Sequence, residues 1–278
     1  MQHEPHSDVP APPAPARRAP WLDWLLLAGG LGVIALIWLI TPGDLLDKAD
    51  HVGYGICHQI PLRSPFFAGR QLPLCARCSG QFLGALGGLL LLIALGRGKA
   101  AKLPPRAVVI VLLGFMAVWA LDGLNSYATF FPGAPQLYQP HNILRTATGA
   151  MQGVALISLV LPFFSVTLWA QPSPRPTLAN LREVLLLIGL AVLITVAVSS
   201  HWAPLLYPLA LLSVAGALMM LALVNTMLVV LALKREGQTA GWRQALPLLI
   251  AGLALALVEL LLINLLRAWL TAQWSLPF

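Results

Sequence analysis

Charged residues are scarce in this sequence. Asp, Glu, Lys and Arg together make up only 10% of its 278 residues, whereas 58% are hydrophobic. Because a soluble domain usually carries about a quarter charged residues, this composition excludes an ordinary water-soluble fold. The net charge of +7 does not indicate nucleic acid binding, because the Lys and Arg residues stand singly between apolar runs and form no dense patch. Scattered cations of this kind are typical of the cytoplasmic loops of a membrane protein.

Common catalytic motifs are missing as well. The sequence contains no glycine-rich phosphate loop, no serine nucleophile motif and no paired carboxylates, and no internal repeat is visible. It therefore points to no reaction class and to no small-molecule substrate. We expect a structural or binding role rather than catalysis.

Long apolar runs dominate what is present. Each run approaches the roughly 20 residues that an α-helix needs to cross the hydrocarbon core of a bilayer. The sequence thus predicts an all-α integral membrane protein, a bundle of about seven transmembrane helices with a Cys/His-containing extramembrane loop at 41–79 after the first helix. The second run is short and the sixth is long, so six or eight spans also fit. The predicted spans are 22–40, 80–95, 107–124, 143–169, 184–200, 205–233 and 245–266.

The distribution of Lys and Arg predicts the orientation, because cationic loops resist translocation. One set of alternate loops carries most of these cations, and the opposite loops carry few, except for the loop at 41–79 with its four cations. We therefore expect a cytoplasmic N-terminus, an extracytoplasmic C-terminus and an extracytoplasmic Cys/His loop in the cell membrane. The cations that support this topology are Arg17, Arg18, Arg97, Lys99, Lys102, Arg106, Arg175, Arg182, Lys234, Arg235 and Arg243.

Small residues recur at four-residue spacing in two of the predicted spans. Gly80, Gly84 and Gly88 lie in the second span, and Gly149 and Gly153 lie in the fourth. Glycines at this spacing let helix backbones approach closely in a membrane. We expect these two helices to pack inside the bundle.

All three cysteines lie within 57–78, with two histidines nearby. Cys75 and Cys78 form a Cys-x-x-Cys pair, whose tight turn can bring two thiolates onto one ion. Cys57 and His58 would complete a tetrahedral set for zinc or another thiophilic metal, although adjacent ligands are unusual and one of them could turn away. His51 is the reserve ligand. Such a closed site leaves no open position for a reacting water, which favours a structural or sensory role.

The same cysteines allow two other readings. Cys75 and Cys78 precede a predicted helix, whose positive end would lower thiol pKa values, and an extracytoplasmic location would favour oxidation. With Cys57 as exchange partner, the chain would then be a membrane thiol-disulfide oxidoreductase, or it would hold a structural disulfide. The third reading is three buried thiols without chemistry, because free cysteine is among the most buried residue types.

Several polar residues are expected at span ends on the side of the cysteine loop. Asp122 and Arg145 could form a partly buried ion pair between adjacent antiparallel helices, or each could extend to water. Glu259 lies well inside the last span, and together these three support a second alternative, a small-solute transporter. His141 and His201 are more simply explained as solvated or hydrogen-bonded side chains than as ligands. The residues expected to support the metal site are His51, Arg63, Arg77, Asp122, Asn142 and Arg145.

A specific series of motifs runs from about Tyr54 to Gly153. It consists of CHQIPLRSPFFAGRQLPLCARCSG, then LDGLNS, then NILRTATGAMQG. This series resembles a prokaryotic membrane protein family known as domain of unknown function 2085. The resemblance implies a small integral membrane protein and no established activity.

The resemblance suggests a division of the chain. We expect a disordered tail rich in Pro and Ala at 1–20, a family-like four-helix membrane core at 21–170, and an additional three-helix membrane region at 171–278. The lipid bilayer is the expected surrounding, and a homo-oligomer or a membrane partner protein is left open.

Overall fold

The structure is a computed structural model that describes residues 20–274. Within these residues it has eight α-helices, seven of which are long and apolar enough to cross a membrane, as the sequence predicts. The tail expected at 1–20 lies outside the described residues except for Pro20, where the first helix begins. The helices are α1 (Pro20–Ile40), α2 (Leu45–Ile56), α3 (Ala76–Ala94), α4 (Arg106–Ala128), α5 (Asn142–Leu168), α6 (Leu181–Ser199), α7 (Leu206–Ala232) and α8 (Trp242–Trp274).

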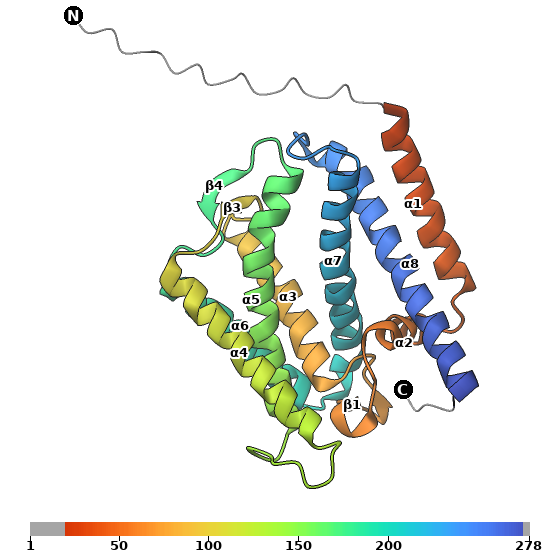
Figure 1. Ribbon diagram of the computed structural model, residues 1–278, viewed down its shortest axis with the longest axis vertical. Helices are drawn as coiled ribbons and strands as arrows, with labels where there is room; N and C mark the ends of the chain where they lie inside the picture. Colours follow the sequence, from red (N-terminus) through yellow and green to blue (C-terminus); the bar gives the residue numbers. More distant parts are fainter. Residues whose placement is uncertain (1–19, 275–278) are drawn as a thin grey trace, which may run out of the picture.

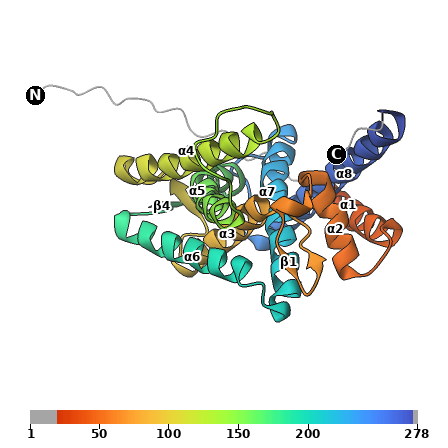
Figure 2. The same cartoon turned by 90° about the horizontal axis from the view of Figure 1, so that it is seen from below.

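Helices α3 and α5 form the centre of the bundle. Helices α4 and α6 lie on either side of this pair, and α7 separates it from α8 and α1 (Figures 1 and 2). In the most apolar stretch of α5, 61% of the residues are buried. In the corresponding stretch of α1, which packs on α8 at the edge of the bundle, only 6% of the residues are buried. In a bilayer this exposed apolar surface faces lipid, so α1 is a peripheral anchor.

The glycines of α3 and α5 explain why these two helices are so close. A Cβ atom at Gly80 would overlap the carbonyl oxygen of Thr146 in α5, and one at Gly149 would overlap the carbonyl oxygen of Arg77 in α3. The prediction that these two helices pack inside the bundle is confirmed. Because lipid tails are as apolar as leucine, such close packing supplies much of the stabilisation that hydrophobic burial gives in water.

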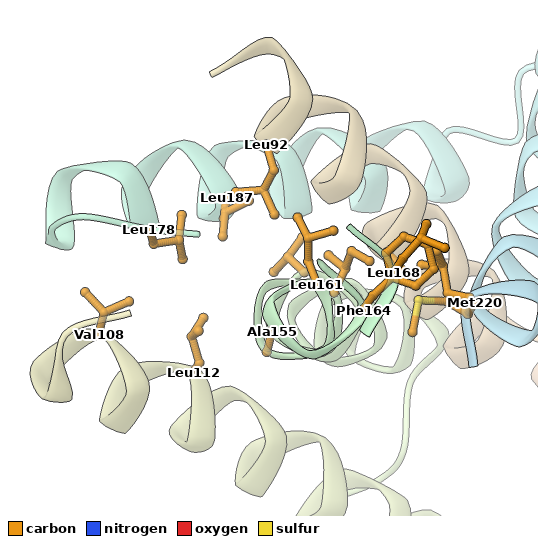
Figure 3. Packing of buried hydrophobic residues seen from close by; sticks show 14 of the residues in the cluster. Leu92, Val108, Leu112, Ala155, Leu161, Phe164, Leu168, Leu178, Leu187 and Met220 are labelled. Carbon is orange, nitrogen blue, oxygen red and sulfur yellow. The ribbon is translucent and has the colours of Figure 1, made fainter. Parts of the chain in front are cut away.

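Apolar side chains from four helices fill the space around α5. Figure 3 shows Leu92 of α3, Leu112 of α4 and Leu187 of α6 gathered around Leu161 of α5, and all four are fully or almost fully buried. Interior packing of this density resists changes in side-chain volume. The α3–α5 pair is therefore held in position from both sides.

The connections divide into two ends. At one end β3 (Ala100–Lys102) pairs in parallel with β4 (Ser173–Pro176), and Arg97 forms an ion pair with Glu183 at 2.6 Å. The opposite end carries α2, the α4–α5 connection, the short 3₁₀ turn η2 (Ala203–Leu205) and the end of α8 (Figure 1). The Cys/His loop thus lies at the end opposite to the cationic strands; the side of the membrane that each end faces stays a prediction.

The loop expected at 41–79 contains a helix that we did not predict. Helix α2 begins with a capping box, in which the Asp44 carboxylate accepts from the Asp47 N–H and the Asp47 carboxylate accepts from the Asp44 N–H, each at 2.9 Å. After α2 the chain forms the 3₁₀ turn η1 (Pro61–Arg63) and a tight hairpin of β1 (Phe66–Phe67) and β2 (Arg70–Gln71). This hairpin leads directly into α3.

Candidate metal centre

Two helix ends bring the cysteines together. Cys57 ends α2, where its N–H donates to the Gly53 carbonyl at 2.8 Å, and Cys75 is the residue on which α3 begins. Between them Gln59 reverses the chain with a φ of 51°, and its side-chain amide donates to the Pro73 carbonyl at 2.8 Å. These contacts lock the end of α2 against the start of α3.

Three potential ligands converge at this junction. The ligand atoms of Cys57, His58 and Cys75 all lie within 4.8 Å of one another. In a tetrahedral zinc site, bonds of about 2.0–2.3 Å place neighbouring ligand atoms roughly 3.5–3.8 Å apart, so a small contraction is sufficient. Both cysteines are 4% exposed, whereas His58 is exposed. The group could hold a metal ion.

Cys78 supplies a third thiol beside this group. It lies one turn into α3 and packs against Cys57 and Cys75, although its sulfur is not among the three ligand atoms that mutually lie within 4.8 Å. To serve as a fourth ligand, the Cys78 sulfur would have to move closer to the other three ligand atoms. His51, the reserve ligand, is outside the group, and its carbonyl accepts from the Asn264 amide at 2.8 Å.

The electrostatics of the thiols favour a thiolate at Cys57. Hydrogen bonds from the Cys75 and Cys78 thiols hold the pKa of Cys57 well below its usual range, while the hydrogen bond to Cys57 raises the pKa of Cys75 to about 11. The backbone N–H of Cys75 also donates to the Cys57 sulfur at 3.3 Å. The thiolate is the form of cysteine that binds metals, so the lowered pKa of Cys57 suits a metal ligand.

The imidazole of His58 is held in another contact. Its Nδ1 accepts from the Ile60 N–H at 3.3 Å. A neutral imidazole has a single ring-nitrogen lone pair, so binding a metal through either nitrogen would end this contact. Of the predicted ligands, His58 would therefore change its local hydrogen bonding most clearly on metal binding.

An arginine of the last helix contacts the backbone at the end of α2, beside the candidate ligands. Arg267 of α8 donates to the carbonyls of Tyr54 and Cys57, at 3.0 Å for Cys57, and its guanidinium lies 3.8 Å from the centre of the Tyr54 ring. Nothing near Arg267 in the sequence indicates this role, because its partners lie more than 200 residues earlier. The sequence shows only a single cation near the end of an apolar run.

Comparisons with known proteins show the family to which this chain is similar. The family model described as "Predicted membrane protein (DUF2085)" matches residues 57–159. An uncharacterized protein of Methanothermobacter thermautotrophicus is 32% identical over 108 residues, which are 37% of this chain and 83% of that protein. The chain belongs to the DUF2085 family. An uncharacterized protein of Methanocaldococcus jannaschii is 33% identical over 109 residues, 39% of this chain, and the match spans 64% of that protein's length. No solved structure matches.

The DUF2085 segment contains all four predicted ligands and a polar network beside them. Arg77, between Cys75 and Cys78, donates to the Asp122 carboxylate of α4, with 3.2 Å from Nε to Oδ2, and to the Ser126 hydroxyl at 3.0 Å. Asp122 is 1% exposed and also accepts from the Tyr138 hydroxyl at 2.6 Å. The network connects the cysteine turn to α4 and to the α4–α5 connection.

This network corrects one expectation. Asp122 does not pair with Arg145 in the described structure, because Arg77 occupies its carboxylate instead. Arg145 donates from Nε to the Ser126 hydroxyl at 3.3 Å and from Nη1 to the Asn142 side-chain oxygen at 2.8 Å. Both arginines approach Ser126, so the helix ends expected to converge do so, with a different pairing.

The remaining predicted polar residues support the loop from outside the ligand group. Arg63 donates to the Ser126 carbonyl at 3.1 Å and lies 3.9 Å from the centre of the Phe130 ring. The amide of Asn142 donates to the Leu62 carbonyl at 3.3 Å. Glu259 accepts from Asn225 of α7 at 2.8 Å, so it belongs to the α7–α8 contact and not to the network around Asp122. The Cys/His loop is therefore attached to α4 and α5 at several points around the cysteines.

Proposed function

We propose that the Cys/His loop binds zinc or another thiophilic metal through Cys57, His58, Cys75 and Cys78, and that the bound metal has a structural or sensory role. The observation that carries the proposal is the approach of the Cys57, His58 and Cys75 ligand atoms to within 4.8 Å of one another. Cys78 is the fourth ligand by its position one turn after Cys75. Three thiolates with one imidazole form one of the closed four-ligand sets that are typical of structural zinc sites.

Burial supports metal binding over thiol exchange. Thiol exchange requires a partner to reach a sulfur atom, and Cys57 and Cys75 are each 4% exposed. A metal that enters through the exposed His58 needs no such access by a second protein. The contacts around the site also favour a structural role, because a metal there would hold the end of α2, the start of α3 and, through Arg267, the last helix together.

The location that we propose for the site is the extracytoplasmic surface of the cell membrane. The support comes from the cations at the opposite end, including Arg97, Lys102 and Arg175 on and beside the β3–β4 pair. The loop's own cations are partly neutralised, because Arg70 forms ion pairs with Asp47 at 2.7 Å and with Asp50 at 3.0 Å.

Cobalt substitution tests the ligand set. Co²⁺ bound to thiolates gives charge-transfer absorption whose intensity increases with the number of sulfur ligands, so we would titrate Co²⁺ into reduced protein in detergent. We expect saturation near one ion per chain, a weaker band in Cys78→Ser, and no band in the double variant Cys75→Ser with Cys78→Ser. His51→Ala is the matched control, because this histidine lies outside the ligand group.

Protein taken before the reduction step distinguishes the alternative of thiol exchange. If wild-type protein gave no cobalt band, and alkylation before and after reduction showed a mass difference of two thiols, two of the cysteines would form a disulfide instead of a metal site. A cobalt band that persisted in the double variant would contradict the proposed ligands.

A further inference from the structure

Arg145 carries a buried charge that has no carboxylate partner among the described residues. The residue is 7% exposed, and its guanidinium donates to the neutral oxygens of Ser126 and Asn142. Burying a cation is costly unless an opposite charge compensates it. The nearest carboxylate, Asp122, is already bonded to Arg77.

The neighbourhood has an excess of positive charge. Arg63 and Arg77 lie within electrostatic range of Arg145, and the acidic groups in that range are the Asp122 carboxylate and the Cys75 thiol. Three guanidinium groups thus lie near a single carboxylate. An anion would remove this imbalance.

A cavity of about 300 Å³ lies beside this charge. It is enclosed by the η1 turn, the start of α5 and the end of α6, and no Asp or Glu lines it. Its volume is at the lower limit of about 300–1,000 Å³ that is usual for small-ligand sites. The polar residues that line it are His141, Asn142, Arg145, Thr146, Ser199 and His201.

Two further features make the cavity suitable for an anion. The 27-residue helix α5 begins at Asn142, so its positive dipole end lies at the cavity wall. Nδ1 of His141 accepts from the Ile143 N–H at 3.3 Å, which places the proton of the neutral ring on Nε2 as a donor.

We propose that this cavity binds a phosphate group, either inorganic phosphate or the headgroup of a phospholipid. A phosphate presents several acceptor oxygens in different directions, which suits donors that approach from Arg145, His141 and the start of α5. The cavity mouth also includes Leu62, which is 89% exposed, and Ile143, which is 47% exposed. These side chains offer apolar contacts to the lipid that would carry such a headgroup.

Binding assays on delipidated full-length protein test the proposal with both sources of phosphate. The first assay titrates inorganic phosphate in detergent and follows the thermal unfolding midpoint. The second compares reconstitution with phosphatidylglycerol and with a galactolipid that has no phosphate. The variants are Arg145→Gln and His141→Asn, because asparagine is also a favourable N-cap for the start of α5. Arg175→Gln, an exposed cation at the other end, is the control.

Stabilisation by inorganic phosphate, with an apparent Kd about tenfold weaker in both variants and unchanged in the control, would establish a site for the free anion. Stabilisation by phosphatidylglycerol alone, with the same dependence on both residues, would establish a headgroup site. If Arg145→Gln does not fold, His141→Asn gives the comparison. No stabilisation by either source, or equal stabilisation in wild type and variants, would overturn the proposal.

Discussion

The guanidinium of Arg77 donates from Nε to Oδ2 of Asp122 at 3.2 Å and also contacts that carboxylate through Nη2. Arg77 stands in the first turn of α3 between Cys75 and Cys78, whereas Asp122 is near the end of α4. The pair therefore connects the Cys-x-x-Cys turn at the start of α3 to α4, which packs beside α5.

Removing the charge of Asp122 should strongly destabilise the protein. Asp122→Asn leaves Arg77 as a buried cation without its partner, a situation that typically costs roughly 3–5 kcal/mol. We expect a loss of this size in the free energy of unfolding, measured by titration with a denaturing detergent. Glu236→Gln removes an exposed carboxylate as the control. Equal stability of Asp122→Asn and Glu236→Gln would show that the pair contributes nothing.

At Gly149, helix α5 packs closely against the first turn of α3, which carries Arg77 and Cys78. A Cβ there would overlap the Arg77 carbonyl, whereas a Cβ at Gly114 of α4 would meet nothing within 4 Å. We expect Gly149→Ala to destabilise by about 1–3 kcal/mol, because the helices must separate. Gly114→Ala should be neutral or slightly stabilising, because alanine favours helix. Thermal unfolding of the two variants side by side makes the comparison, and the reverse order would contradict the packing described for α3 and α5.

The sequence predicts the parts of this structure that depend on local patterns. Apolar runs are enough to identify the seven membrane helices, and the spacing of Gly80 and Gly149 with their neighbours predicts the α3–α5 contact. Cys75 and Cys78 are close in sequence, and Cys57 joins them because the chain reverses between the end of α2 and the start of α3. Helix α2 was missed because it is only 12 residues long, although Asp44 and Asp47 have the spacing of a capping box.

Pairings between distant segments could not be predicted. Asp122 lies near the end of α4 and Arg145 near the start of α5. The rotation of each helix about its axis decides which arginine contacts the Asp122 carboxylate. In the structure this arginine is Arg77. Arg267 is 210 residues from Cys57, and only the packing of α8 brings them together. Such contacts follow from tertiary packing and leave no local signature.

Arg267 should stabilise the end of α2 from α8. Arg267→Leu removes the hydrogen bond to the Cys57 carbonyl and the contact with the Tyr54 ring, and we expect a loss of about 1–3 kcal/mol in stability. The matched control is Arg243→Leu, an exposed cation at the start of the same helix. Hydrogen exchange of the α2 amides would localise the effect. Unchanged exchange in Arg267→Leu would contradict a link between α8 and the site.

Tyr138 should titrate later than an ordinary tyrosine. Burial and the hydrogen bond to the Asp122 carboxylate raise the pKa of Tyr138 to about 12. A group whose pKa is raised on folding stabilises the folded state fully below its unfolded pKa of about 10, and this contribution is lost as the pH rises through 12. In an absorbance titration of tyrosinate, Tyr138→Phe should remove the step near pH 12 and leave the earlier steps unchanged. Loss of a step near pH 10 instead would contradict the hydrogen bond.

The metal content of purified protein tests the central claim most directly. We would measure metal by mass spectrometry in detergent-purified wild type and in the double variant Cys75→Ser with Cys78→Ser, and count free thiols in the same samples. The proposed site predicts close to one thiophilic metal ion per chain in wild type, none in the double variant, and new reactive thiols in wild type after chelation. Wild-type protein without metal, whether its three thiols are free and unreactive or two of them form a reducible disulfide, would contradict it.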